Sequence, residues 1–221
     1  MAAKAPKKGR FVTLEGLEGA GKTSCLHAVV ETLQRRGLDP VLTREPGGTP
    51  VGEALRELLL DPRHRGMSAE AELLAVFAAR AEHLQKVILP ALERGQWVVS
   101  DRFTDASYAY QGGGRGIDSQ RIAALEEWLQ NGFQPDLTLF LDVPVSVGLG
   151  RAAARAGEAD RFEQEEQAFF EAVRGAYLKR ADDDPARVHR IDASRSPEVV
   201  ASDVAASVES FVTRVVTGGT E

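Results

Sequence analysis

A glycine-rich segment near the N-terminus constrains this chain more than any other feature. Its residues are Gly16, Leu17, Glu18, Gly19, Ala20, Gly21, Lys22 and Thr23, which have the spacing G-x-x-x-x-G-K-T. In a phosphate-binding loop of this spacing, glycines let backbone N–H groups turn inward around a triphosphate, the lysine reaches the β- and γ-phosphates, and the threonine hydroxyl binds Mg²⁺. An apolar run at 11–14 precedes the loop and an apolar helical pattern follows it. The sequence therefore predicts a strand, a phosphate-binding loop and a helix whose positive dipole end faces the anion.

Length and composition narrow the remaining classes of protein. The 221 residues are 43% hydrophobic and 27% charged, which is typical of a globular chain without a membrane span. A net charge of −6 argues against a general nucleic-acid binder. The single cysteine, Cys25, allows no internal disulfide and favours a reducing, cytoplasmic setting. We expect residues 1–9 to form a flexible tail and residues 10–221 to form one domain.

Short apolar runs alternate with longer helical patterns, as in a parallel sheet flanked by helices. The predicted strands are Phe11–Glu15, Pro40–Thr43, Trp97–Ser100, Leu137–Leu141 and Val188–Ile191. The predicted helices lie near 21–36, 50–60, 69–94, 118–130, 144–155, 162–182 and 197–215. Because ligands of open parallel sheets bind at the carboxyl ends of the strands, the residues that follow each strand are candidates for a site.

Several segments after the predicted strands carry charge or glycine. Asp101 and Arg102 follow the strand at 97–100, where Asp101 could act on Mg²⁺ and Arg102 could bind a second phosphate. Residues 43–49 and 112–116 are rich in glycine, and local composition predicts turns at both. The second of these turns could be a flexible connection or a backbone cradle around a base.

Three arginines gather near the predicted helix at 144–155. Arg151 and Arg155 are four residues apart and would share a helix face, and Arg161 follows an Ala/Gly-rich turn. Such charges usually form a solvated face. An arginine on a closing segment can also stabilise the charge of a transferred phosphoryl group.

In combination, these motifs resemble those of the bacterial thymidylate kinases. The shared motifs are GLEGAGKT at 16–23, TREPGGT at 43–49, DRF at 101–103, AYQGGGRG at 109–116, and an arginine-rich segment followed by DRFEQE at 160–165. The similarity extends from about Arg10 to the C-terminal helix. It implies a P-loop nucleoside-monophosphate kinase fold with a five-stranded parallel sheet and a short lid at about 150–161. It also implies a cytoplasmic homodimer that uses ATP and Mg²⁺ to convert dTMP to dTDP for DNA synthesis.

The resemblance further implies roles for individual residues. Residues 16–23 would hold ATP, and Thr23 and Asp101 would serve the magnesium. The acceptor dTMP would be bound by Glu45, Arg56, Phe77, Arg80, Arg102, Ser107, Tyr110 and Gln111. Within that set the arginines would clamp the phosphate, Ser107 and Gln111 would contact the thymine edge, and Tyr110 would lie beside the sugar 2′ position. Glu45 would lie near the acceptor sugar and phosphate.

Two details of this chain bear on the assignment. Family members with an acidic loop residue, here Glu18, take a catalytic cation from the lid, which points to Arg155 alongside Lys22 and Arg102. An additional alanine before Gly157 leaves Arg151 and Arg161 as alternatives. The aromatic residue that stacks on thymine commonly stands four positions before the arginine at 80, where this chain has Val76; Phe77 is the nearby aromatic, and a phenylalanine on a helix is ordinarily part of the core.

Two other functions remain to be weighed. A nucleoside kinase could share the loop and use Glu45 as a general base on a sugar hydroxyl. The trio Arg56, Arg80 and Arg102 favours an acceptor that already carries a phosphate. A nucleotide-dependent switch is disfavoured because the chain has no N-K-x-D guanine signature.

Overall fold

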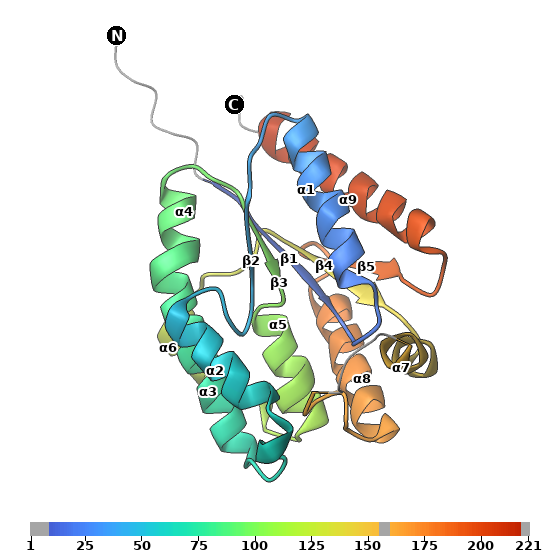
Figure 1. Ribbon diagram of the computed structural model, residues 1–221. Coiled ribbons are helices and arrows are strands. Elements are labelled where there is room, and N and C mark those ends of the chain that lie inside the picture. The colour runs from blue at the N-terminus through green and yellow to red at the C-terminus, as the bar shows by residue number, and fades with distance from the viewer. Residues whose placement is uncertain (1–8, 155–159, 218–221) are drawn as a thin grey trace.

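A parallel sheet with strand order β2-β3-β1-β4-β5 forms the centre of the computed structural model, which describes residues 9–154 and 160–217 (Figure 1). The strands are β1 (Phe11–Gly16), β2 (Val41–Arg44), β3 (Val98–Asp101), β4 (Leu137–Asp142) and β5 (Val188–Asp192). Each agrees with its predicted strand to within one residue at either end. The prediction of a five-stranded parallel sheet is confirmed.

Helices cover both faces of this sheet (Figure 1). α1 (Lys22–Arg35) and α9 (Pro197–Thr217) pack side by side on one face, and α5 (Thr104–Ser107) and α8 (Gln167–Asp183) lie on the other. The remaining helices are α2 (Pro50–Leu60), α3 (Ala69–His83), α4 (Leu89–Glu93), α6 (Ser119–Gln130) and α7 (Val145–Ala153), with a short 3₁₀ turn at Pro62–His64. A π-helical turn at Leu84–Ile88 joins α3 to α4, so the long helix predicted near 69–94 is confirmed. In the described ranges, no helix combines the length and apolar character needed to cross a membrane.

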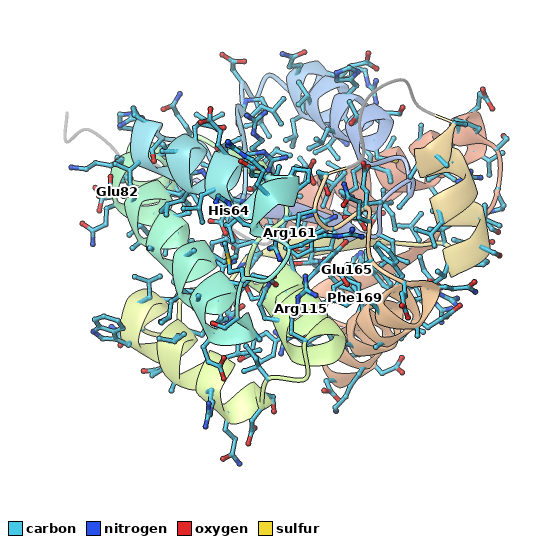
Figure 2. All side chains as sticks on the ribbon, turned by 60° about the horizontal axis from the view of Figure 1, so that its bottom comes forward. His64, Glu82, Arg115, Arg161, Glu165 and Phe169 are labelled. Carbon is cyan, nitrogen blue, oxygen red and sulfur yellow. The ribbon has the colours of Figure 1, made fainter. Side chains whose placement is uncertain are left out.

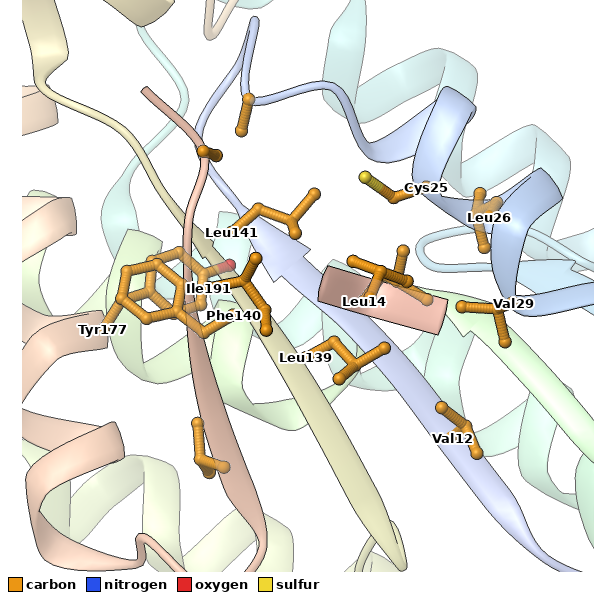
Figure 3. Packing of buried hydrophobic residues seen from close by; sticks show 14 of the residues in the cluster. Val12, Leu14, Cys25, Leu26, Val29, Leu139, Phe140, Leu141, Tyr177 and Ile191 are labelled. Carbon is orange, nitrogen blue, oxygen red and sulfur yellow. The ribbon is translucent and has the colours of Figure 1, made fainter. Parts of the chain in front are cut away.

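The central strand β1 is packed on both faces, which explains its apolar sequence. Val12 and Leu14 face α1, where Val29 meets them in one buried cluster (Figure 3). On the other face of the sheet, Phe140 of β4 stacks on Tyr177 of α8 with ring centroids 5.0 Å apart. Packing from both sides therefore fixes the carboxyl end of β1, where the glycine-rich loop begins.

Local sequence sets the start of two helices at the edge of the site. The Thr49 hydroxyl accepts a hydrogen bond from the Gly52 amide at 2.9 Å, and Pro50 occupies the first turn of α2. Ser68 caps α3 in the same way by accepting a hydrogen bond from the Ala71 amide at 3.3 Å. Both helices thus begin where short polar side chains satisfy free backbone N–H groups.

The glycines at 112–114 do not form the turn that the sequence predicted. Residues Tyr108–Gly114 are π-helical and continue α5. A Cβ at Gly113 would lie 2.7 Å from the Ala172 carbonyl oxygen, and one at Gly114 would lie 2.4 Å from the Phe169 ring. The glycines therefore allow a close approach to α8, a tertiary reason that local composition does not reveal.

Two predicted boundaries also need correction. The helix predicted at 162–182 begins at Gln167, because the Asp160 carboxylate accepts the Phe162 and Glu163 amides at 2.9 Å and folds this segment into a turn. Gly9, which we expected in the tail, is buried and donates its N–H to the Leu92 carbonyl at 3.0 Å. Residues 1–8 of the predicted tail lie outside the described residues.

A carboxyl group lies inside the core, on β1 directly before the loop. Glu15 is fully buried; Oε1 accepts the Phe103 amide and Oε2 accepts the Tyr177 hydroxyl, both at 2.7 Å. Burial raises the pKa of Glu15 to about 8, and the nearby Asp105 adds to the rise while Arg102 opposes it. In the folded protein, Glu15 is therefore mainly protonated below a pH of about 8.

The raised pKa predicts a pH-dependent effect of Glu15→Gln on stability. Because the folded-state pKa lies above the ordinary value of 4.5, the stability that the protonated form contributes is fully present below pH 4.5 and is lost as the pH rises through about 8. Glutamine keeps the neutral form, so the Tm of the variant relative to the parent protein should increase from pH 5 to pH 8.5. Thermal unfolding followed by circular dichroism measures this difference.

Glu31→Gln on the exposed side of α1 is the control, and its Tm difference should stay constant with pH. A Glu15→Gln difference that is equally constant would contradict the assignment of a raised pKa to Glu15.

Candidate active site

A cavity of about 490 Å³ opens at the carboxyl ends of β1, β2 and β3. The residues predicted for the site that line it are Glu18, Gly19, Gly21, Lys22, Thr23, Glu45, Arg56, Arg80, Asp101, Arg102, Ser107, Tyr110 and Gln111. Arg151 lines it as well. The structure therefore gathers most of the predicted site from five separate segments of the chain into one cavity.

The glycine-rich loop can hold its shape because two of its positions exclude a side chain. Gly16 has φ +141° and a Cβ there would lie 2.6 Å from the Leu141 carbonyl oxygen. Gly19 has φ +70° and a Cβ there would lie 2.0 Å from the Gly148 carbonyl oxygen. Leu17 and Ala20 are buried and anchor the loop in the core instead of lining the cavity. The loop is thus wedged between the core and the first turns of α7.

Lys22 lies over its own loop. Its ammonium group donates hydrogen bonds to the carbonyl oxygens of Gly16 at 3.1 Å and Leu17 at 2.9 Å. The pKa of Lys22 is lowered to about 8, chiefly by burial and also by the neighbouring Arg102, against the opposing effect of Asp101 and Glu18. A phosphate group in the loop would stabilise the charged ammonium and offer it better acceptors than these two carbonyls.

Arg102 lies next to the loop in a backbone conformation unusual for arginine. Its φ is +71°, and the Ser100 hydroxyl donates to its carbonyl at 2.8 Å. The guanidinium donates to Glu18 at 3.0 Å and to the Tyr177 hydroxyl at 3.1 Å, and it lies 4.6 Å from the centre of the Tyr110 ring. Such left-handed residues persist where surrounding contacts determine them, often at functional sites. The contacts direct this cation toward the loop.

Asp101, one residue earlier, carries a carboxylate oxygen that is free for a ligand. Oδ1 is buried without a hydrogen-bond partner among the described residues, and Asp101 lines the cavity. In the same ranges, no group of three or more His, Cys, Asp or Glu side chains is arranged to hold a metal ion by itself. A cation here would therefore need oxygen ligands from its substrate as well.

A buried ion pair follows β2. Oε2 of Glu45 accepts from Nε of Arg80 at 2.7 Å, and Oε1 accepts from Nδ1 of His83 at 2.9 Å. Arg80 also donates to the Ser107 hydroxyl at 3.1 Å. The sequence predicted Glu45, Arg80 and Ser107 for the site but not His83, although His83 stands three residues after Arg80 on the same helix face. Glu45 thus holds Arg80 and His83 in place with both of its oxygens.

Phe77 is not where the prediction required it. Its side chain is in an apolar cluster with Leu73 and Ile122, and its ring lies 4.7 Å from the Arg80 guanidinium. Val76 lines the cavity and Phe77 does not. Consecutive side chains on a helix point about 100° apart, and here Val76 is the one that faces the cavity. Phe77 is therefore a core residue whose ring packs against the Arg80 guanidinium.

Arg56 completes the positive wall of the cavity. It is half-buried on α2 and donates to the Pro46 carbonyl at 3.0 Å. Burial lowers its pKa, as does the positive charge of Arg44, while Glu53 opposes the shift. Such a desolvated guanidinium is well suited to bind an anion that enters the cavity.

The three candidate arginines of the lid have different positions. Arg151 lines the cavity and donates to the Ala193 carbonyl at 2.8 Å. Arg161 is fully buried, pairs with Glu72 at 2.7 Å, and does not line the cavity. Arg155 lies outside the described residues. The position of Arg161 removes it as an alternative for the lid cation, because its guanidinium is already bound inside the protein.

Sequence reasoning missed two buried carboxylates, Glu15 and Glu72. Both are fully buried, and both hold residues next to the cavity. The available signal was an acidic residue inside an apolar strand or helical pattern, which predicts a buried charge with a fixed partner.

Comparison with known proteins agrees with this geometry. The family model described as "Thymidylate kinase" matches residues 14–204. The chain is 60% identical over 207 residues to the thymidylate kinase of Halorhodospira halophila, covering 93% of this chain and 96% of that protein. It is 57% identical over 211 residues to the thymidylate kinase of Alkalilimnicola ehrlichii, covering 96% of this chain and 97% of that protein.

The fold agrees with that of a solved structure as well. The crystal structure of thymidylate kinase from Ehrlichia chaffeensis superimposes with a TM-score of 0.72 at 32% identity, covering 91% of this chain and 99% of the other. The predicted P-loop nucleoside-monophosphate kinase fold is thereby confirmed. With the matching family model and the similar curated proteins, this likeness shows that the chain belongs to the thymidylate kinase family.

Proposed function

We infer that this protein is an ATP-dependent kinase that transfers the γ-phosphate of ATP to dTMP and yields dTDP and ADP. The observation that carries the inference is one cavity that is lined by the phosphate-binding loop, by Arg102 beside that loop, and by the guanidinium groups of Arg56 and Arg80. Two phosphorylated substrates would meet end to end in such a cavity.

At the donor end, the loop amides and Lys22 would hold the phosphates of ATP. The buried, unpaired oxygen of Asp101 and the exposed hydroxyl of Thr23 fit a magnesium ion, whose remaining ligands would come from the phosphates. When bound, the ion would neutralise phosphate charge. Lys22 would leave the Gly16 and Leu17 carbonyls to bind phosphate oxygens.

At the acceptor end, Arg56 and Arg102 would bind the phosphate of dTMP and aim one of its oxygens at the γ-phosphorus in line with the leaving oxygen of ADP. Ser107 and Gln111 would contact the base, and Tyr110 would lie beside the sugar. Little covalent chemistry is required of the protein, since positioning and charge neutralisation account for most catalysis of phosphoryl transfer.

The environment of Glu45 favours a monophosphate acceptor over a nucleoside. A nucleoside kinase would need a free carboxylate to take the proton of a sugar hydroxyl. Both oxygens of Glu45 are occupied, by Arg80 and His83. Glu45 therefore orients Arg80 and is not free to act as a base, whereas Arg56 and Arg102 fit an acceptor that already carries a phosphate.

An assay of ADP release with different acceptors tests the function. We expect kcat/KM for dTMP to exceed kcat/KM for thymidine by roughly 100-fold or more. Thymidine has no phosphate that could accept charge-assisted hydrogen bonds from the arginines. Comparable rates with thymidine would identify a nucleoside kinase, and turnover unaffected by any acceptor would identify a switch. The same acceptor panel without enzyme is the control.

The lid arginines lead to a second prediction. An arginine that stabilises the transferred group can contribute roughly 10³-fold or more to kcat. We expect Arg155→Ala to lower kcat by about that factor with little change in the KM for dTMP. Arg151→Ala should chiefly raise the KM for ATP, because Arg151 lines the cavity from α7, which packs against the phosphate-binding loop at Gly19. Steady-state kinetics of both variants distinguish them, and full activity of Arg155→Ala would exclude Arg155 from the chemistry.

We also propose that the protein is a homodimer that uses the outer surface of α3 and α6. Leu74 is 57% exposed and Trp128 is 83% exposed. Leu74 shares a helix face with Glu70, and Trp128 shares one with Arg121. The Glu70 and Arg121 side chains approach to 3.9 Å, which places the two faces next to each other. Large apolar side chains on adjacent faces are typical of an interface.

Sedimentation of the double variant Leu74→Glu/Trp128→Glu tests the dimer. The parent protein should sediment at twice its chain mass of 23.9 kDa, and the variant should sediment at that mass, because two new charges on each subunit would oppose association. A parent protein that remains monomeric, or a variant that remains dimeric, would contradict the proposed surface. The cytoplasmic setting stays a prediction from the resemblance and the single cysteine.

A further inference from the structure

Gln111 presents its amide to the cavity in one orientation. The residue is buried with 3% exposure and lines the cavity. Its Nε2 donates to Oε1 of Glu72 at 2.9 Å. Within the part of the chain that the structure describes, the amide oxygen of Gln111 has no hydrogen-bond partner. The donor side of this amide is thus used inside the protein, and the acceptor side is left for a ligand.

The Glu72 carboxylate is paired with two guanidinium groups, so it accepts hydrogen bonds and donates none. It is fully buried, and Oε2 accepts from Arg161 at 2.7 Å and from Arg115 at 3.1 Å. Arg115 in turn pairs with Glu165 at 2.7 Å. Figure 2 shows Arg115, Arg161 and Glu165 close together near the N-terminal end of α3, where Glu72 lies. A carboxylate between two guanidinium groups offers acceptor oxygens and no donor.

This arrangement determines which way the Gln111 amide points. If the amide turned over, its oxygen would face Oε1 of Glu72, and two acceptors would meet at hydrogen-bond distance without a proton between them. Such a contact is repulsive in a buried site. The Glu72 carboxylate therefore keeps the Gln111 oxygen turned away from Glu72, where this oxygen can accept a hydrogen bond from the base of the nucleotide to be phosphorylated.

An acceptor at this position distinguishes between pyrimidines. Thymine and uracil carry N–H at N3, and cytosine has a lone pair there, so the Gln111 oxygen can bond the first two and repels the third. Arg80, with its N–H groups on the same cavity wall, would meet the C4 carbonyl of thymine, whereas cytosine has an amino group at that position.

We propose that Glu72 is a positioning residue that sets base specificity, because it fixes the Gln111 amide as an acceptor for the N3–H of thymine. The proposal rests on the function inferred above. It assigns Glu72 a role beyond anchoring the segment at 160–165, and the two roles predict different kinetics.

Glu72→Gln is the direct test, because glutamine can donate as well as accept and permits both orientations of Gln111. We expect the ratio of kcat/KM for dTMP to kcat/KM for dCMP to fall by about 10-fold or more, the usual size of a mismatched buried hydrogen bond, with the KM for ATP unchanged. Glu82→Gln on the same helix, nearly three turns after Glu72, should keep the parent ratio. An unchanged ratio in a folded Glu72→Gln protein would overturn the proposal.

A double-mutant cycle separates positioning from anchoring. In a Gln111→Leu background, Glu72→Gln should leave the dTMP-to-dCMP ratio unchanged, because its effect passes through Gln111. If Glu72 only anchored the segment at 160–165, Glu72→Gln would lower the activities with dTMP and with dCMP equally in either background. That result would overturn the proposal. If the parent protein did not phosphorylate dTMP, the inferred function would fail instead.

A measurement on the parent protein covers the case in which Glu72→Gln does not fold. In NMR spectra of the parent protein, the side-chain amide signals of Gln111 are those that are missing from the spectrum of the Gln111→Leu variant. The proton that this amide donates to Glu72 should exchange slowly, because its hydrogen bond is buried. Exchange as fast as that of an exposed glutamine would place the NH₂ group in the cavity and overturn the proposal.

Discussion

The backbone pairing of β1 with its two neighbours is the constraint on which the rest of this protein depends. Leu14 is in register with Asp101 of β3 and with Leu139 of β4, and the Arg102 amide donates to the Leu14 carbonyl at 2.9 Å. The glycine-rich loop and the Asp101–Arg102 pair therefore leave the sheet side by side. Because parallel strands end at the same edge, the hydrogen bonds of the sheet would bring the donor and acceptor phosphates together in the proposed site.

Buried and half-buried carboxylates orient the donors of the cavity. Glu18 contacts Arg102, Glu45 contacts Arg80, and Glu72 contacts Gln111. A chain with a net charge of −6 thus carries a cavity wall rich in guanidinium groups, of which Arg80 and Arg102 are each paired with a carboxylate. This arrangement limits the rotamers of long side chains before substrate binds, so less conformational entropy is lost at binding.

Features with local causes were predictable from the sequence, and features with tertiary causes were not. The strands and the phosphate-binding loop follow from apolar runs and glycine spacing, and the structure bears both out. The helical course of residues 108–114 depends on contact with α8, and the core position of Phe77 depends on which helix face meets the cavity. Neither fact is written in local composition. His83 and Glu72 were missed for the same reason, since their roles exist only with partners from distant segments.

We infer that one cavity holds two phosphates end to end, and a crystal structure with a non-hydrolysable ATP analogue and dTMP would test this arrangement. In such a crystal we expect Lys22 to leave the Gly16 and Leu17 carbonyls for the phosphates of the analogue, and the dTMP phosphate to lie against Arg56 and Arg102. A dTMP phosphate bound elsewhere, with these two guanidinium groups in bulk solvent, would rule out this arrangement of the two substrates.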